Sequence, residues 1–237
     1  MVLDNKTNSF IGVIPARGGS KRLPNKNLRI INQSSITELA IQEGLKSRFI
    51  KKIILSSDSS EILALGRNYD ISIDKRDACL STDKSTTLSL LENLITKYNI
   101  DPENTSFVLL QPTSPLRFTE DIDRAINIYN ANNADSVVSA FKVPNFLSYK
   151  KMMEVSDENK ILNFELNEIK NKKIFVRNGP AVLVTKVENV IAGSLYGFKT
   201  YISEMPFNRS IDIDEKEDYI YAKLMYENFL IDNFNKI

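Results

Sequence analysis

The chain of 237 residues has no histidine and a single cysteine. Without histidine it cannot form a Ser-His-Asp triad, a Cys-His nucleophile or a histidine-ligated zinc site. General base catalysis near neutral pH would therefore depend on a carboxylate, a lysine or a metal-bound group. Cys79 has no second cysteine with which to form a disulfide inside the chain. These residue types remain compatible with a reaction driven by electrostatic positioning of phosphate groups.

The chain also lacks a long hydrophobic run and an excess of either charge. No uninterrupted apolar stretch is long enough to cross a bilayer, and residues 1–9 contain no apolar signal-peptide core. Lys and Arg total 31 against 30 Asp and Glu, whereas a general nucleic-acid-binding protein usually has a strong basic excess. We therefore expect a soluble, cytoplasmic protein that binds neither membranes nor nucleic acid.

Short apolar runs alternate with segments of helical periodicity. The runs are typical of strands buried on both faces of a sheet and comprise residues 10–14, 52–55, 107–110, 136–140 and 181–184. Apolar residues at helical spacing occur at 35–47, 60–68, 87–98, 119–130 and 218–229. This alternation predicts an α/β fold, a Rossmann-like, mostly parallel sheet with helices on both faces.

Residues 141–177 interrupt the alternation. They are rich in Lys, Asn and Glu, and their apolar residues are scattered. Because an unstructured loop of this length is uncommon inside a compact domain, we expect a solvent-exposed insertion or a small subdomain that completes its core against another chain. Residues 1–140 and 178–237 would then form the α/β core.

The segment that follows the first predicted strand, residues 14–28, is Ile-Pro-Ala-Arg-Gly-Gly-Ser-Lys-Arg-Leu-Pro-Asn-Lys-Asn-Leu. It combines two glycines with four cations and no acidic residue. Glycines let main-chain N–H groups approach an anion, and the cations supply charge for a nucleotide's phosphates. The spacing is neither that of a P-loop nor that of a dinucleotide-binding fingerprint. A solvated basic turn is the alternative, although the crowding of four like charges favours phosphate binding.

Three informative loops, residues 15–27, 56–59 and 111–117, follow predicted strands directly. In open sheets of this class, ligands bind at the carboxyl ends of the strands. We therefore expect these loops to border one site.

Asp212 and Asp214 lie one residue apart. On an extended segment their carboxylates would point the same way and would suit Mg²⁺, which also binds phosphate oxygens and water. Capping of the last predicted helix explains Asp214 equally well. Asp58, after the second predicted strand, is interpreted first as a cap of the helix that begins near Ser59.

Four segments together resemble the cytidylyltransferases that activate nine-carbon acidic sugars, which are the CMP-sialic acid synthetases and their bacterial relatives for legionaminic and pseudaminic acids. They are residues 14–28, Ser-Ser-Asp at 56–58, Leu-Gln-Pro-Thr-Ser-Pro-Leu-Arg at 110–117 and Ser-Ile-Asp-Ile-Asp at 210–214. The resemblance covers most of the chain. It implies a fold of the nucleotide-diphospho-sugar transferase type and transfer of CMP from CTP to the sugar's anomeric hydroxyl, with release of pyrophosphate.

That reaction needs cations and usually Mg²⁺ rather than a covalent nucleophile, because the hydroxyl attacks the α-phosphorus in line. The resemblance therefore implies catalytic roles for Arg17, Lys21 and Asp212. It also favours metal ligation by both Asp212 and Asp214, with Asp212 in addition polarising the attacking hydroxyl.

The resemblance further implies a nucleotide-binding set, namely Ala16, Arg17, Gly18, Lys21, Lys26, Asn27, Thr82 and Thr86. In it, Lys26 and Asn27 serve the α-phosphate and the nearby ribose or base, and main-chain groups of Ala16 and Gly18 contact the cytosine. For Arg22 a solvated surface charge is an equally good interpretation. Residues 82–87, including Asp83, are also explained as a plain helix N-terminus.

For the acceptor sugar, the resemblance implies hydrogen bonding by Gln111, and Arg117 either pairs with a carboxylate or braces its loop. Lys142 and Arg177 are candidates for the sugar's carboxylate or are ordinary surface charges. The sialic-acid enzymes have an aromatic residue in a late strand where 181–184 is aliphatic. The acceptor therefore stays open, with 3-deoxy-manno-octulosonate or another sugar as the alternative and a non-catalytic nucleotide-binding protein as the second. The family also dimerises through an extension near 141–177, which implies a homodimer.

Overall fold

The computed structural model describes residues 9–82, 85–147, 154–157, 160–163 and 173–234. Its centre is an eight-stranded sheet. Along the sheet the strands are β10 (Phe175–Arg177), β7 (Ser136–Lys142), β11 (Leu183–Lys186), β6 (Thr105–Leu109), β1 (Ser9–Pro15), β4 (Ile50–Ser57) and β5 (Ser72–Lys75), and β12 (Thr200–Glu204) also pairs with β7.

The sheet is mixed but mostly parallel, as the sequence predicts. Four adjacent strands run parallel to one another, namely β6, β1, β4 and β5. β12 also runs parallel to β7. β11 is antiparallel to both β6 and β7, and β10 is antiparallel to β7. A parallel neighbour needs a crossover connection, usually a helix. The described residues between β7 and β11 contain no α-helix, and the chain returns antiparallel.

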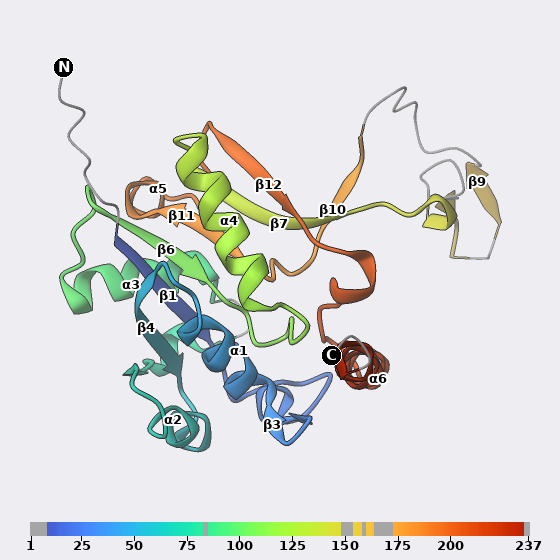
Figure 1. The fold of residues 1–237 in the computed structure, drawn as a ribbon, viewed down its shortest axis with the longest axis horizontal. Coiled ribbons are helices and arrows are strands. Elements are labelled where there is room, and N and C mark those ends of the chain that lie inside the picture. The colour runs from blue at the N-terminus through green and yellow to red at the C-terminus, as the bar shows by residue number, and fades with distance from the viewer. Residues whose placement is uncertain (1–8, 83–84, 148–153, 158–159, 164–172, 235–237) are drawn as a thin grey trace.

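Helices cover both faces of the sheet. α1 (Ile36–Leu45), α2 (Ser60–Gly66) and α4 (Thr119–Ala131) pack on one face, and α1 and α4 lie in front of the sheet in Figure 1. α3 (Thr87–Tyr98) and the short α5 (Val187–Ile191) pack on the other face. Adjacent residues of a strand pack against opposite helix layers. Ile14 packs in the hydrophobic cluster with α1, α2 and α4, Val13 packs in the cluster with α3 and α5, and both are fully buried.

The C-terminal helix α6 (Lys216–Phe234) belongs to a third, smaller hydrophobic cluster. There Ala222 and Ile213 pack with Ile36 and Leu39 at the start of α1 and with Ile31 of the short strand β2 (Ile30–Ile31), which pairs with β3 (Ser34–Ser35). The segment 210–214 is thus held between α1 and α6. None of the described helices is long and apolar enough to cross a membrane.

Three helices begin just after a serine or threonine that lies at, or just before, the start of a predicted helical segment. Ser35 forms a capping box with Glu38 at α1, and the side chains of Ser59 and Thr86 accept hydrogen bonds at the starts of α2 and α3. The sequence missed β5 and β12 because both are short and partly polar, Ser-Ile-Asp-Lys and Thr-Tyr-Ile-Ser-Glu.

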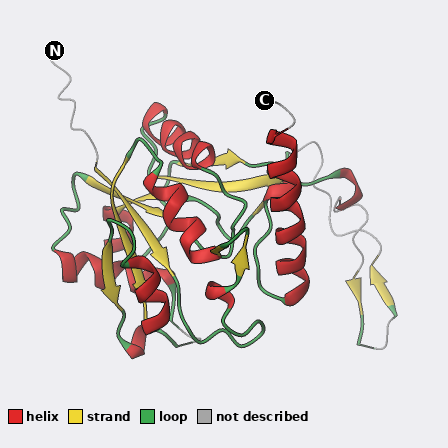
Figure 2. Ribbon diagram, turned by 60° about the horizontal axis from the view of Figure 1, so that its bottom comes forward, coloured by secondary structure: helices red, strands yellow, loops and turns green. Residues whose placement is uncertain are grey.

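Residues 141–177 contain the end of β7, the 3-10 helix η3 (Asn145–Leu147), β8 (Glu154–Val155), β9 (Ile161–Asn163) and β10. Within the described part of the chain, β8 and β9 form a two-stranded sheet of their own, and Figure 2 shows this pair of strands standing apart from the main body. β10 returns to the main sheet against Ala140–Lys142. Other 3-10 turns are η1 (Lys26–Leu28), η2 (Ala78–Leu80) and η5 (Phe207–Arg209). The division of the chain at 140 and 178 stays a prediction.

Candidate active site

A cavity of about 460 Å³ lies where β1, β5 and β6 end and α3 begins. The loop after β1 contributes four of the predicted residues, namely Arg17, Lys21, Lys26 and Asn27, and also Arg22. Other segments contribute Arg76, Thr82, Thr86, Gln111, Thr113 and Asp214. Segments that are far apart in the sequence therefore meet at the carboxyl edge of the sheet, where this fold class binds its ligands.

The loop after β1 is anchored by an acid from the next strand. The main-chain N–H of Gly18 donates to Asp58 Oδ1 at 2.8 Å, and a Cβ at Gly18 would lie 2.9 Å from Ser59 Cβ. Ser59, not Asp58, caps α2, because its hydroxyl accepts from the N–H of Ile62. The interpretation of Asp58 as a helix cap is therefore wrong, and its carboxylate instead fixes the glycine turn.

Ala16 and Gly18 do not border the cavity. The main-chain N–H of Ala16 donates to Ser56 O at 3.0 Å, and the carbonyl of Gly18 accepts from Ser20 at 2.9 Å. These bonds shape the loop and leave neither N–H directed at the cavity. The predicted main-chain contacts with cytosine stay a prediction.

Asn27 borders the cavity with an unpaired acceptor. Its side chain is buried, and Nδ2 donates to the carbonyl of Arg17 at 2.9 Å. Among the residues that the structure describes, Oδ1 has no hydrogen-bond partner. A buried acceptor without a partner costs free energy until a donor reaches it. The hydroxyl and amino groups of a nucleoside are donors of the required kind.

Asp214 is paired with two cations of the loop. Its Oδ1 lies 2.9 Å from Lys26 Nζ, and its Oδ2 lies 3.0 Å from Arg22 Nη2. Partial burial raises the pKa of this carboxyl, but the contacts with Lys26 and Arg22 outweigh burial and leave the pKa below its usual value. Asp218, in the first turn of α6, accepts from the main-chain N–H groups of Asp214 and Glu215 at 2.9 Å, just before the helix begins. The Asp214 carboxylate thus pairs with loop cations, and its capping role stays a prediction.

Asp212 does not line the cavity itself, and its neighbour Thr113 does. Burial raises its pKa, as does the charge of Asp214, while a hydrogen bond with Thr113 acts in the opposite direction. A Cβ on Gly179, where φ is +110°, would lie 3.5 Å from Asp212 Cγ. The two carboxylates are thus within electrostatic reach of each other but differ in exposure to the cavity.

These two carboxylates fit a magnesium ion that is shared with a ligand. No group of three or more Asp, Glu, Cys or His residues among those described is arranged to hold a metal ion. Mg²⁺ is commonly held by one or two carboxylates with phosphate oxygens and water completing its shell. A pair of acids beside a cation-lined cavity suits that mode better than a metal site made by protein alone.

Arg76 is a cavity residue that sequence reasoning missed. Its guanidinium is buried and donates to Ser56 Oγ at 3.2 Å and Ser56 O at 2.9 Å, and Ser56 Oγ in turn donates to Asp74 Oδ2 at 2.6 Å. Burial lowers the pKa of Arg76, and the negative charges of Asp58 and Asp74 partly offset this effect. The signal was the alternation of Ile71 and Ile73, which marks a strand ending just before Arg76.

Two threonines before α3 border the cavity, and their hydroxyl groups form hydrogen bonds with nearby residues. Thr86 Oγ1 accepts from the N–H of Ser89, and Thr82 Oγ1 lies 2.8 Å from Ser85 Oγ. Arg17 Nη1 also reaches the Thr82 carbonyl at 3.5 Å. The segment thus forms a helix N-terminus beside the cavity, with Thr86 rather than Asp83 or Ser85 as the N-cap. Asp83 lies outside the described residues.

Three predicted sugar-binding residues lie away from the cavity. Arg117 is 1% exposed and donates to the carbonyls of Gln111 at 3.0 Å and Ala181 at 3.2 Å, so it braces the loop and is not placed to bind a substrate. Burial lowers its pKa to about 10. Lys142 and Arg177 are exposed at the ends of β7 and β10, and Arg177 donates to Tyr196 Oη at 2.6 Å.

A protein-family model described as cytidylyltransferase matches residues 11–227. N-acylneuraminate cytidylyltransferase of Streptococcus agalactiae serotype V is 29% identical over 96% of this chain and 56% of that protein, so the chain spans about half the length of this relative. CMP-N,N'-diacetyllegionaminic acid synthase of Legionella pneumophila is 30% identical over 92% of this chain and 96% of that protein. Pseudaminic acid cytidylyltransferase of Campylobacter jejuni is 24% identical over 91% and 95% of the two chains.

Solved structures agree with the fold. A CMP:2-keto-3-deoxy-manno-octonic acid synthetase complexed with CTP superposes with a TM-score of 0.65 at 12% identity, covering 93% of this chain and all of that one. A 4-diphosphocytidyl-2C-methyl-D-erythritol synthase gives a TM-score of 0.66 at 10% identity over 92% and 99% of the two chains. The predicted fold class and the family resemblance are both confirmed. The chain belongs to the cytidylyltransferase family of nucleotidyltransferases.

Proposed function

We propose that this protein transfers CMP from CTP to the anomeric hydroxyl of a nine-carbon acidic sugar and releases pyrophosphate. One observation carries the proposal, namely that the cations of the loop after β1, Arg76 and Asp214 border one cavity. Such a cavity suits a triphosphate that arrives with a divalent cation. The acceptor class is supported by relatives named for acylneuraminic, legionaminic and pseudaminic acids.

In this proposal the loop cations neutralise the charge that grows on the phosphates. Arg17 and Lys21 bind the triphosphate, and Lys26 serves the α-phosphate. The unpaired Oδ1 of Asn27 accepts a hydrogen bond from the ribose or the base, which relieves the cost of its burial. Gln111 borders the same cavity and serves as the hydrogen-bonding group for the sugar.

Asp212 and Asp214 would hold Mg²⁺, which when bound supplies positive charge to the phosphate oxygens. Asp214 is paired with Lys26 and Arg22 in the chain alone. When a nucleotide enters, its phosphates replace Asp214 as the partner of both cations, which frees the carboxylate for the metal. Asp212 is the more buried of the two acids and orients the attacking hydroxyl.

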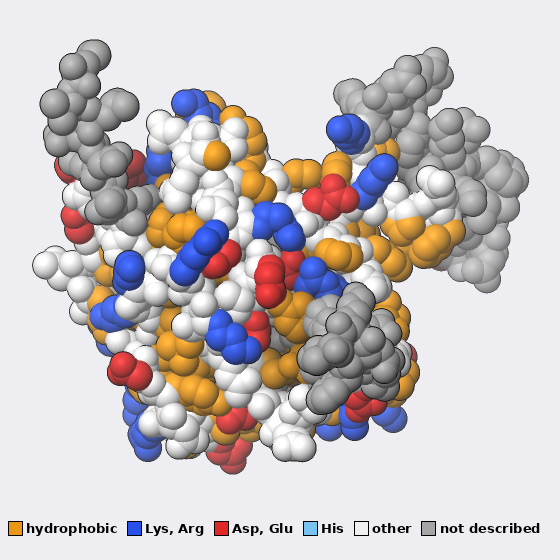
Figure 3. All heavy atoms as spheres, in the orientation of Figure 1, with side chains coloured by type: hydrophobic (Ala, Val, Ile, Leu, Met, Phe, Trp, Pro, Cys, Tyr) orange, Lys and Arg blue, Asp and Glu red, His pale blue; other side chains and the backbone are white. Residues whose placement is uncertain are grey.

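A homodimer is part of this proposal. Lys142 and Arg177 lie outside the cavity of their own chain and so serve a sugar only at a neighbouring site. Exposed hydrophobic side chains of η3, β10 and β12 support such an interface, among them Phe146, Val176, Tyr201 and Ile202. Hydrophobic side chains gather on the right of the face drawn in Figure 3, where η3 and β10 lie.

A substrate panel tests the proposal as a whole. With CTP and Mg²⁺, we expect pyrophosphate release with at least one of N-acetylneuraminic, legionaminic and pseudaminic acids, measured by a coupled phosphate assay. Release with 3-deoxy-manno-octulosonate alone would favour that acceptor instead. Binding of CTP by calorimetry without release with any sugar would favour a non-catalytic protein.

Asp212→Asn should reduce kcat about 100-fold or more, because the substitution removes a charge that acts at the reacting groups. The CTP dissociation constant should change less than about threefold. Glu215→Gln is the matched control, because Glu215 is a neighbouring acid that is exposed on the first turn before α6. Equal activity of the two variants across a Mg²⁺ titration would show that Asp212 has no catalytic role.

Lys21→Ala should weaken CTP binding about ten- to a hundredfold, the usual value of one charge-assisted contact with phosphate. Lys51→Ala removes the same charge from an exposed position early in β4, away from the carboxyl edge, and should leave affinity unchanged. Calorimetric titration with CTP compares the two. If both variants bind CTP as the wild type does, the loop does not hold the triphosphate.

The homodimer should have twice the 26.9 kDa mass of the chain in sedimentation equilibrium. Ile202→Glu places a charge in the exposed apolar surface of β12 and should shift the mass toward that of one chain. Ile30→Glu, at a similarly exposed isoleucine of β2, should not. A wild-type protein that sediments as a single chain at micromolar concentration would exclude the dimer.

A further inference from the structure

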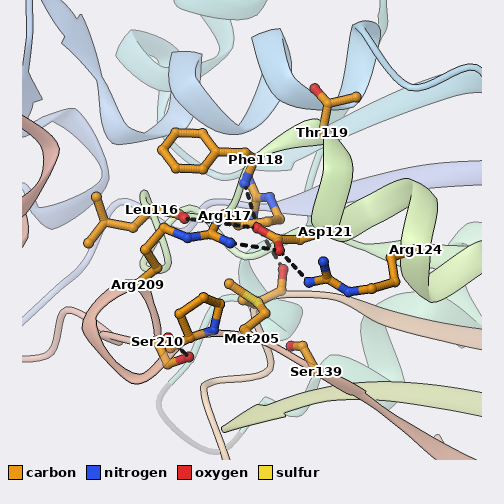
Figure 4. Close-up of polar contacts among 12 residues, drawn as sticks. Leu116, Arg117, Phe118, Thr119, Asp121, Arg124, Ser139, Met205, Arg209 and Ser210 are labelled. Atoms are coloured by element: carbon orange, nitrogen blue, oxygen red, sulfur yellow. Dashed lines mark hydrogen bonds and ion pairs between the residues drawn. The ribbon is translucent and has the colours of Figure 1, made fainter. Parts of the chain in front are cut away.

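A buried ionic cluster ties the segment that carries Asp212 and Asp214 to the loop after β6. We define it by Asp121, Arg124 and Arg209, and Figure 4 shows the two guanidinium groups reaching the Asp121 carboxylate from opposite sides. Asp121 is 1% exposed and lies in the first turn of α4. Its Oδ2 also accepts from the N–H of Phe118 at 3.1 Å, which closes the helix N-terminus.

The two arginines hold this carboxylate in different ways. Arg209 Nη1 lies 2.5 Å from Oδ2 and Nη2 lies 3.1 Å from Oδ1, a two-pronged contact, while Arg124 Nη2 reaches Oδ1 alone at 2.5 Å. Arg124 is on the same helix as Asp121, three residues further along, and its side chain is 41% exposed. Arg209 comes from η5, is 17% exposed and also donates to the carbonyl of Leu116 at 3.1 Å. Only Arg209 joins two segments that are distant in the sequence.

Asp212 lies between Arg209 and a second tie to the same loop. Four residues after Arg209, the main-chain N–H of Ile213 donates to the carbonyl of Thr113 at 2.8 Å. The segment from 209 to 213 is thus pinned to residues 113–116 at both of its ends. Neither the sheet nor a helix includes residues 210–214, so side-chain and loop contacts set the position of the Asp212 carboxyl. These two pins act together with the Asn178–Ser210 hydrogen bond and the packing of Ile213.

We propose that Arg209 is a positioning residue for the Asp212–Asp214 pair. Its guanidinium fixes the distance between the acids and the loop that borders the cavity, and it touches neither nucleotide nor sugar. A displacement of about 1 Å in a reacting group is enough to cost about 100-fold in rate. The expected loss of rate rests on the proposed function. The expected loosening of residues 209–214 rests only on the contacts described above.

Arg209→Gln and Arg124→Gln make a matched pair, since each removes one cation from the same buried carboxylate. We expect Arg209→Gln to lower kcat about ten- to a hundredfold and to raise the Mg²⁺ concentration for half-maximal rate, with the CTP dissociation constant within about threefold of wild type. Arg124→Gln should retain wild-type kcat and Mg²⁺ dependence. If both variants lose stability to a similar extent, that loss reflects only the missing partner of the Asp121 carboxylate.

Arg209→Lys keeps the charge but not the fork, because one ammonium cannot meet both Asp121 oxygens and the Leu116 carbonyl. It should lie between wild type and Arg209→Gln in kcat, and it carries the test if Arg209→Gln does not fold. Hydrogen exchange of peptides that span residues 209–214, measured without ligand, should be faster than wild type in the Arg209 variants and unchanged in Arg124→Gln.

Two outcomes separate the inference from the function on which it rests. Equal kcat and equal exchange in the Arg209 and Arg124 variants would overturn the positioning role, whatever the substrate. A wild-type protein without pyrophosphate release would overturn the proposed function, and the exchange comparison would then still decide whether Arg209 pins the segment.

Discussion

The crowding of positive charge at the carboxyl end of β1 is the constraint on which the rest of the site depends. Arg17, Lys21, Arg22, Lys26 and Arg76 border one cavity, and like charges at such distances repel. Acidic residues from other parts of the sequence partly neutralise these cations. Asp214 pairs with two of the loop cations, and Asp58 and Asp74 counter the effect of burial on Arg76. A triphosphate with its metal would take over the balancing role that Asp214 has in the chain alone.

The direction of β11 explains how four segments converge on that cavity. A strand that runs antiparallel to its neighbours begins where they end, and Leu183 at the start of β11 pairs with Leu109 at the end of β6. Residues 178–182 are therefore delivered to the carboxyl edge. The side-chain amide of Asn178 donates to Ser210 Oγ, and its main-chain carbonyl accepts from Ser114 Oγ, so one buried residue links three loops. A parallel β11 would have placed this turn at the opposite edge.

Local patterns in the sequence were sufficient for the parallel half of the sheet, the capped helices and the loops that follow β1 and β6. Each of these depends on residues close together in the chain, such as the apolar run before Pro15 or the cap at Ser35. The failures depend on distant partners. From the sequence alone Asp58 and Ser59 are equally good helix caps, and the bond from the Gly18 N–H shows which role Asp58 has. For Arg117 the sequence left pairing with a carboxylate and bracing of the loop both open, and the carbonyls of Gln111 and Ala181 decide for bracing. Arg76 was missed because β5 is too short and polar to stand out.

The ionic cluster at Asp121 is best understood by asking what its second arginine adds. Taking ions out of water is costly, and a buried ion pair is weak evidence for stability. Arg124 already neutralises the carboxylate from within α4, and Arg117 brings further positive charge nearby, since a pKa of about 10 leaves it protonated at neutral pH. Arg209 is therefore not required for charge balance. What it contributes instead is a connection of η5 to the loop after β6 and to α4, four residues before the Ile213–Thr113 hydrogen bond joins the same two segments. A costly buried contact that is redundant for neutrality is explained by the geometry it imposes, which here is the position of an acid beside a cavity made for phosphates.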